Sequence, residues 1–95
     1  MDLVEEVKKL CKELNENSLV EAIDRFILLN KGIEKTRGEH FAKAGIYGFL
    51  EGILTTLKLK YNNPKVNSLL EIVREARSRE EVYLRKAKPP IAEGQ

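Results

Sequence analysis

The sequence has one cysteine and one histidine, and this scarcity excludes several kinds of site. Cys11 alone forms neither a disulfide within the chain nor a cysteine-based zinc cage. It lies among the apolar residues of a helical pattern, so we interpret it as a buried structural thiol. A catalytic pair with His40 would need Cys11 to leave the core. The sequence therefore predicts no metal, no cofactor and no small-molecule substrate.

Long apolar runs are also missing. The longest mainly apolar stretch, residues 44–57, contains Glu51 and is too short to span a bilayer. No basic segment followed by an apolar stretch marks a secretory signal. We expect a cytoplasmic protein with no membrane partner.

Charge, in contrast, is abundant, since charged residues make up 34% of the chain. Lys and Glu dominate and Gln occurs once, a composition that favours a source from a hot environment. Residues 1–57 carry 8 basic and 10 acidic side chains, whereas residues 58–88 carry 9 basic and 4 acidic ones. The last third of the chain is therefore its basic end.

Apolar residues recur with a helical period in four stretches, near residues 2–14, 17–31, 39–60 and 64–87. The second stretch has a capping-box pattern at Ser18 and Glu21, and Gly32 is its expected end. Residues 31–38 then form a long, irregular link. Pro64 suits the first position of the last helix, with Asn63 as its cap.

These stretches predict the fold class. No stretch alternates apolar and polar residues between hairpin turns, so we expect no sheet. The prediction is an all-α, four-helix, bundle-like single domain over residues 1–88, with two short helices followed by two long ones. Residues 89–95 are expected to form a flexible C-terminal tail.

Three glycines of the third helical stretch, Gly45, Gly48 and Gly52, fall within about 60° of one another. They lie beside Phe41, Ala44 and Leu59. Glycine inside a helix costs up to about 1 kcal/mol relative to alanine, so close approach of another helix is expected to offset the cost. We expect that helix to come from the same chain. The alternative is a groove that receives a helix from another protein.

The opposite side of this helix carries the one alignment of titratable groups, namely His40, Tyr47, Glu51 and Lys58. We interpret it as a solvated face. A proton-transfer site built from Tyr47 and Glu51 is the alternative, because these residues are four apart. The remaining ionisable groups do not converge, so the sequence predicts no catalytic residue and no enzyme.

The last helical stretch offers two candidate binding surfaces. A basic ridge contains Arg74, Arg77, Arg85 and Lys88, with Lys58, Lys60 and Lys65 at the preceding turn. The ridge could contact phosphates without reading sequence, although Glu81 is placed to pair with Arg77 and Arg85. The alternative is a solubilising face. Apolar residues outside the main stripe predict a protein interface, and they are Ile72, Val82, Tyr83 and Leu84.

In size and character the chain resembles small helical accessory subunits of archaeal replicative polymerases and CRISPR effector assemblies. No motif contributes to this resemblance, and it transfers no site. We expect a non-catalytic accessory or adaptor subunit that binds a larger protein in a nucleic-acid-handling complex, of the replication, repair or CRISPR type. One alternative is a sequence-independent nucleic-acid-binding protein that uses the basic ridge. Another is a homo-oligomeric structural bundle.

Overall fold

The computed structural model describes residues 2–87, and in that range it has four helices and no strand. They are α1 (Leu3–Glu13), α2 (Asn17–Arg37), α3 (Glu39–Lys60) and α4 (Pro64–Ala87). The all-α bundle prediction is confirmed, and α3 and α4 have the predicted bounds. Lys88 and the proposed tail, residues 89–95, lie outside the described residues.

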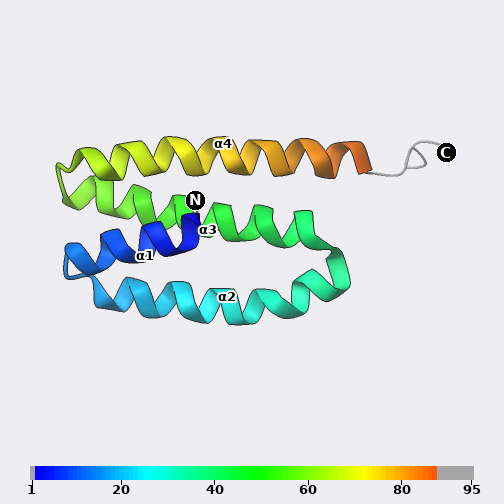
Figure 1. The fold of residues 1–95 in the computed structure, drawn as a ribbon, viewed down its shortest axis with the longest axis horizontal. Helices are drawn as coiled ribbons and strands as arrows, with labels where there is room; N and C mark the ends of the chain where they lie inside the picture. The colour runs from blue at the N-terminus through cyan, green and yellow to red at the C-terminus, as the bar shows by residue number, and fades with distance from the viewer. Residues whose placement is uncertain (1, 88–95) are drawn as a thin grey trace.

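Helix α3 is the centre of the arrangement (Figure 1). It packs against α2 on one side and α4 on the other, and these two outer helices make no contact with each other in the described range. The short helix α1 lies in front of this layer and contacts α2, α3 and α4. One side of the layer is thus covered by α1 over part of its length.

Local signals set most helix ends. The Asp2 carboxylate accepts hydrogen bonds from the backbone N–H groups of Val4 and Glu5 and so caps α1. Asn15 follows α1 in the left-handed region, with φ of 58°, where asparagine is tolerated better than most residues. At the start of α4, the Asn63 side chain accepts a 2.9 Å hydrogen bond from the N–H of Lys65.

The expected end of the second helix at Gly32 is wrong. Helix α2 continues through Gly32 to Arg37 and has 21 residues, so it is not short. The chain turns instead at Gly38, whose φ of 95° lies in the region that favours glycine. Gly32 is exposed and does not adopt the positive φ of a helix-ending glycine, so α2 continues through it. The predicted irregular link therefore shrinks to one residue.

The expected capping box of α2 is also wrong. The N-cap position is Glu16, and no side chain caps this helix end. The Glu16 carboxylate instead accepts 2.6 Å hydrogen bonds from Lys60 Nζ and the Tyr61 hydroxyl. This contact ties the α1–α2 turn to the end of α3.

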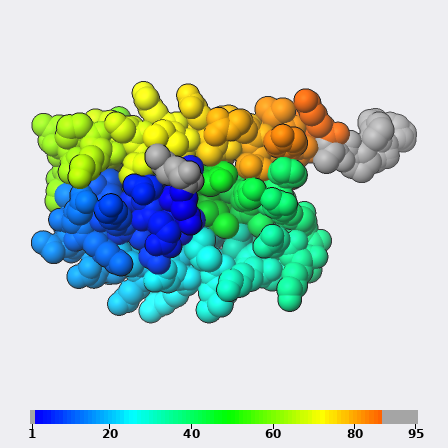
Figure 2. All heavy atoms as spheres, viewed as in Figure 1, coloured from blue at the N-terminus to red at the C-terminus, as the bar shows by residue number. Residues whose placement is uncertain are grey.

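The apolar core is concentrated in the half of the molecule that α1 covers. Its fully buried side chains come from all four helices and include Val7, Leu10, Cys11, Ile23, Leu50, Leu54, Leu57, Val66 and Val73. Towards the α2–α3 turn the buried residues thin out to Asn30, Ala42 and Ala76. Figure 2 shows α1 spread over one end of the layer only.

Candidate protein-binding surfaces

The outer side of α3, facing away from its buried residues, is solvent-accessible and has no charged residue of its own, although the Arg37 guanidinium of α2 lies 5.2 Å from the centroid of the Phe41 ring. On a helical wheel it spans an arc of about 120°. Its eight residues, all exposed or half-buried, are Phe41, Ala44, Gly45, Gly48, Gly52, Thr55, Thr56 and Leu59. We call this surface the open face. An uncharged helix face is notable in a chain of which 34% is charged.

The expectation that another segment of the same chain packs on the glycines is wrong for Gly48 and Gly52 within the described residues. A Cβ atom added to Gly48 or Gly52 would meet no atom within 4 Å beyond the neighbouring residues and the surrounding backbone of α3 itself. One added to Gly45 would meet only the Asn30 side-chain oxygen, at 3.8 Å. The cost of glycine in a helix is therefore not offset by close packing within residues 2–87.

Apolar side chains of α2 border the open face. Phe26 of α2 stacks on Phe49 of α3, with ring centroids 4.4 Å apart. Leu29 and Ile33 follow Phe26 at helical spacing on the side away from α1. Leu29 is 73% exposed, and Leu59 on the open face is 85% exposed. The apolar surface thus extends from α3 onto α2.

Ion pairs border the open face on the α4 side. Glu51 accepts hydrogen bonds from Arg77 Nη1 at 2.6 Å and from Arg74 Nε at 3.1 Å. Arg77 also donates to Glu81, at 3.1 Å. The hydrogen bond from Arg77, helped by Arg74, lowers the pKa of the Glu51 carboxyl below its ordinary value. Both charge signs thus occur along this border.

The interpretation of the His40, Tyr47, Glu51 and Lys58 stripe as a solvated face is wrong for its first three residues. His40 and Glu51 contact α4, and Tyr47 lies beside the start of α1. His40 Nδ1 contacts the Glu80 carboxylate, and the His40 ring stacks on Tyr83 with centroids 4.4 Å apart. Tyr47 is half-buried, and Glu51 pairs with the two arginines described above. Lys58 is exposed. The stripe is mainly a polar seam between two helices.

The basic ridge is largely paired with carboxylates. Arg74 and Arg77 bind Glu51, as described above, and two lysines at the preceding turn also have partners. Lys60 pairs with Glu16 at 2.6 Å, and Lys65 pairs with Glu13 at 3.1 Å. Arg85 and Lys58 are exposed and form no ion pair with a described residue. Lys88 lies outside the described range.

The four residues expected to form an apolar interface on α4 do not form one surface. Val82 and Tyr83 are exposed near the end of α4, whereas Leu84 is half-buried. Ile72 lies ten residues earlier, about 15 Å along the helix axis from Val82. The structure therefore separates this set into an end cluster and a distant single residue.

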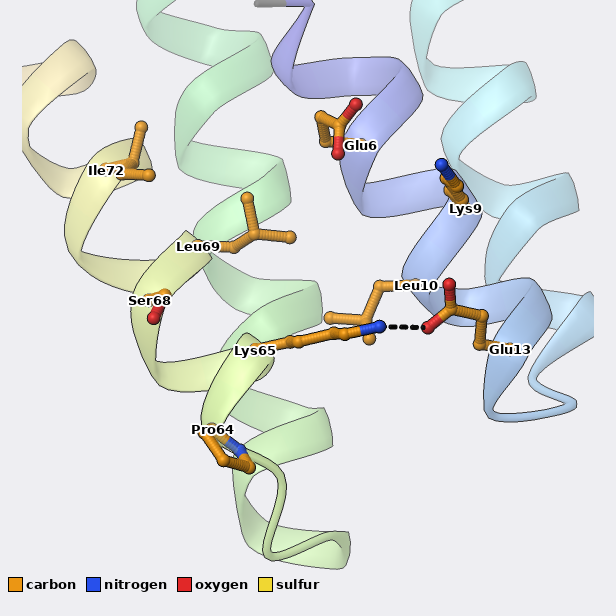
Figure 3. Close-up of a pocket in the computed structure, with 9 residues that line it drawn as sticks. All are labelled: Glu6, Lys9, Leu10, Glu13, Pro64, Lys65, Ser68, Leu69 and Ile72. Atoms are coloured by element: carbon orange, nitrogen blue, oxygen red, sulfur yellow. Dashed lines mark hydrogen bonds and ion pairs between the residues drawn. The ribbon is translucent and has the colours of Figure 1, made fainter.

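Ile72 lines a groove between α1 and α4 (Figure 3). The groove has a volume of about 400 Å³, and Leu10 and Leu69 supply its other apolar side chains beside Pro64. The ion pair between Lys65 and Glu13 crosses from one helix to the other at its rim. Glu6 and Lys9 make the rest of the rim charged with both signs.

Cys11 is fully buried, as the sequence predicted. Burial, helped by the charge of Glu16, raises the pKa of its thiol to about 11. Among residues 2–87, no three His, Cys, Asp or Glu side chains come together in a group able to hold a metal ion. No helix in this range has both the length and the apolarity needed to cross a membrane.

Comparison with known proteins gives the family. Residues 4–94 match the family described as protein of unknown function (DUF3216). The chain belongs to this family. A family relative in the solved structures is the singleton protein PF1176 from P. furiosus, which is 67% identical, with a TM-score of 0.83. The match covers 85% of this chain and 89% of that chain, and no curated protein matches.

Two features of these surfaces are not evident from the sequence. Leu29 is one of the apolar residues that recur with a helical period in the second stretch, and such a pattern suggests burial. Helix α2 does touch both α1 and α3, yet Leu29 remains exposed. Asn30 is a buried polar residue that no motif marks. The only signal for it is its position in an apolar pattern.

Proposed function

We propose that this chain is a non-catalytic protein-binding module whose interface is the open face of α3 with the adjoining apolar edge of α2. The observation that carries the proposal is the uncharged, glycine-lined outer side of the central helix. Such a surface is unusual on a charged protein. It supports a binding role, because contiguous exposed apolar patches tend to mark interaction sites.

The glycines support this proposal because they are costly where they stand. Each destabilises α3 by up to about 1 kcal/mol relative to alanine, and Gly48 and Gly52 touch no other helix of residues 2–87. A partner helix that packs closely on the open face would offset this cost, since glycine lets backbones approach without Cβ atoms between them. The sequence thus favours binding over the stability of the isolated chain.

The setting that we propose, an accessory subunit of a nucleic-acid-handling complex, depends on the basic end of the chain. Arg85 and Lys58 are the candidates for phosphate contact, because both are exposed and without an ion-pair partner among the described residues. The other described residues of the basic ridge, Lys60, Lys65, Arg74 and Arg77, are neutralised by carboxylates. We therefore expect weak, salt-sensitive retention on heparin at most, and protein binding as the main activity.

Affinity purification with paired variants tests the binding function. Tagged wild-type chain, Gly48→Glu and Gly32→Glu are expressed in cells that also contain the natural chain, and the co-purifying proteins are compared. Gly32 is the matched control, because it is an exposed glycine inside α2 with no atom within 4 Å of an added Cβ. We expect at least one partner to be lost with Gly48→Glu and retained with Gly32→Glu. Identical partners for all three would contradict an interface on the open face.

A further inference from the structure

We infer that the partner of the open face is a second copy of this chain, packed as an antiparallel pair of α3 helices around a two-fold axis. This inference rests on the proposed function, since it names the partner of the same surface. The observation behind it is that the open face and its charged border are complementary to themselves under one two-fold rotation.

The apolar residues give the first half of this symmetry. Phe41 and Leu59 lie at opposite ends of the open face, and both are exposed. The midpoint between them along α3 is Leu50. A two-fold axis at that level, perpendicular to α3, places Phe41 of one copy opposite Leu59 of the other. The glycines lie between them, where the two helices come closest.

The charges on α4 give the second half. Arg74 and Glu81 have opposite signs and lie seven residues apart, with their midpoint between Arg77 and Ser78. Arg77 is ion-paired with Glu51, which is the neighbour of Leu50 on α3. The two midpoints therefore lie at nearly the same level of the molecule. The same axis brings Arg74 of one copy opposite Glu81 of the other. Arg77 lies beside the axis, close to Arg77 of the other copy, and the Glu51 carboxylate of its own chain neutralises it.

The area is sufficient for association. The open face is about 27 Å long, from Phe41 to Leu59, and about 20 Å wide once the bordering edges of α2 and α4 are included. Two copies would bury roughly 1,000 Å² in total, which is near the lower limit for a specific interface. We therefore expect a dimer that dissociates on dilution. A partner with a strong net charge would be a poorer match, because the border carries both signs.

Sedimentation equilibrium of the full chain tests the inference. We expect a monomer–dimer equilibrium for the wild type and at least a tenfold weaker dimer for Gly48→Leu. Gly32→Leu, the control outside the open face, should dimerise like the wild type. A wild type that stays monomeric up to about 1 mM, where weak contacts are populated, overturns the inference. So does a dimer that Gly48→Leu leaves unchanged.

A charge exchange tests the two-fold arrangement without touching the glycines. Arg74→Glu and Glu81→Arg should each weaken the dimer, and the double variant should restore it. Failure of the double variant to recover overturns this pairing, with circular dichroism confirming that each variant is folded. If the wild type is monomeric while Gly48→Glu still loses a different co-purifying protein, the second copy is wrong and the binding function holds.

Discussion

The side-chain amide of Asn30 donates a 2.8 Å hydrogen bond to the backbone carbonyl of Ala42, across the turn that joins α2 to α3. Asn30 is 4% exposed and is the one buried polar residue of the described range. It lies where the apolar core has thinned out. A directional bond thus fixes the pairing of α2 and α3 at the end of the bundle that lacks large buried side chains.

Replacing Asn30 by alanine should lower the free energy of unfolding by about 1–2 kcal/mol, because a buried hydrogen bond and its packing are lost. Hydrogen exchange should accelerate first in the last turns of α2 and the first turns of α3. Ser18→Ala, an exposed change in the first turn of α2, is the control. Equal exchange in Asn30→Ala and wild type would refute this role.

Replacing Gly48 or Gly52 by alanine should raise the stability of the isolated monomer by up to about 1 kcal/mol each. Neither new methyl group meets another atom within 4 Å, so the gain in helix propensity is not opposed by a clash. Denaturant titration at low protein concentration measures the effect. Gly38→Ala is the opposite control, since its φ of 95° makes a side chain there destabilising. A loss of monomer stability in Gly48→Ala would show that the open face is already occupied within the chain.

The Glu51 ion pairs should make the free energy of unfolding fall as the pH is lowered through the acidic range. Arg77, then Arg74, lower the folded-state pKa of Glu51. The stabilising contribution of Glu51 is therefore present above its unfolded-state pKa of about 4.3 and is lost as the pH falls through the folded-state pKa. Glu51→Gln should therefore be less stable than wild type by about 0.5–1 kcal/mol above that range. The two should converge as the pH falls further.

Urea titrations from neutral to acidic pH measure this difference. Glu71→Gln removes a carboxylate from an exposed position of α4 and serves as the charge-matched control. A constant gap between Glu51→Gln and wild type down to the lowest pH would contradict the role of the arginines.

Cys11 should be nearly inert towards thiol reagents in the folded protein. Its side chain is fully buried, and a pKa of about 11 leaves little thiolate at neutral pH. The reaction rate should rise sharply in denaturant, in step with unfolding followed by circular dichroism. Rapid labelling of the folded chain would contradict the core placement of α1.

Much of the fold follows from the sequence, because helical period and local caps act over short distances. Asn63 and Pro64 predict the start of α4 correctly. Helix α3 ends at Lys60, as predicted, with Tyr61 as the next residue. The misplaced end of α2 has an equally local cause. Gly32 and Gly38 are both candidates for a helix end, and only the backbone of the second adopts positive φ.

The surfaces were harder to predict because they depend on which helix lies beside which. A helical wheel separates the glycines of α3 from His40 and Glu51, yet it does not say which side meets α4. In the structure His40, Tyr47 and Glu51 are half-buried against neighbouring helices, and no other helix covers Gly48 or Gly52. The ionic partners of the basic ridge, such as Glu16 for Lys60, lie far away in the sequence and have no local signal.

Accessibility of the open-face glycines in solution tests whether the molecule associates through this face. The Hα protons of Gly45, Gly48 and Gly52 are followed by NMR, with a soluble paramagnetic probe, over a range of protein concentrations. We predict strong relaxation enhancement in dilute protein and protection as concentration rises, with Gly32 exposed throughout. Equal enhancement of these three glycines and Gly32 at every concentration would contradict association through the open face.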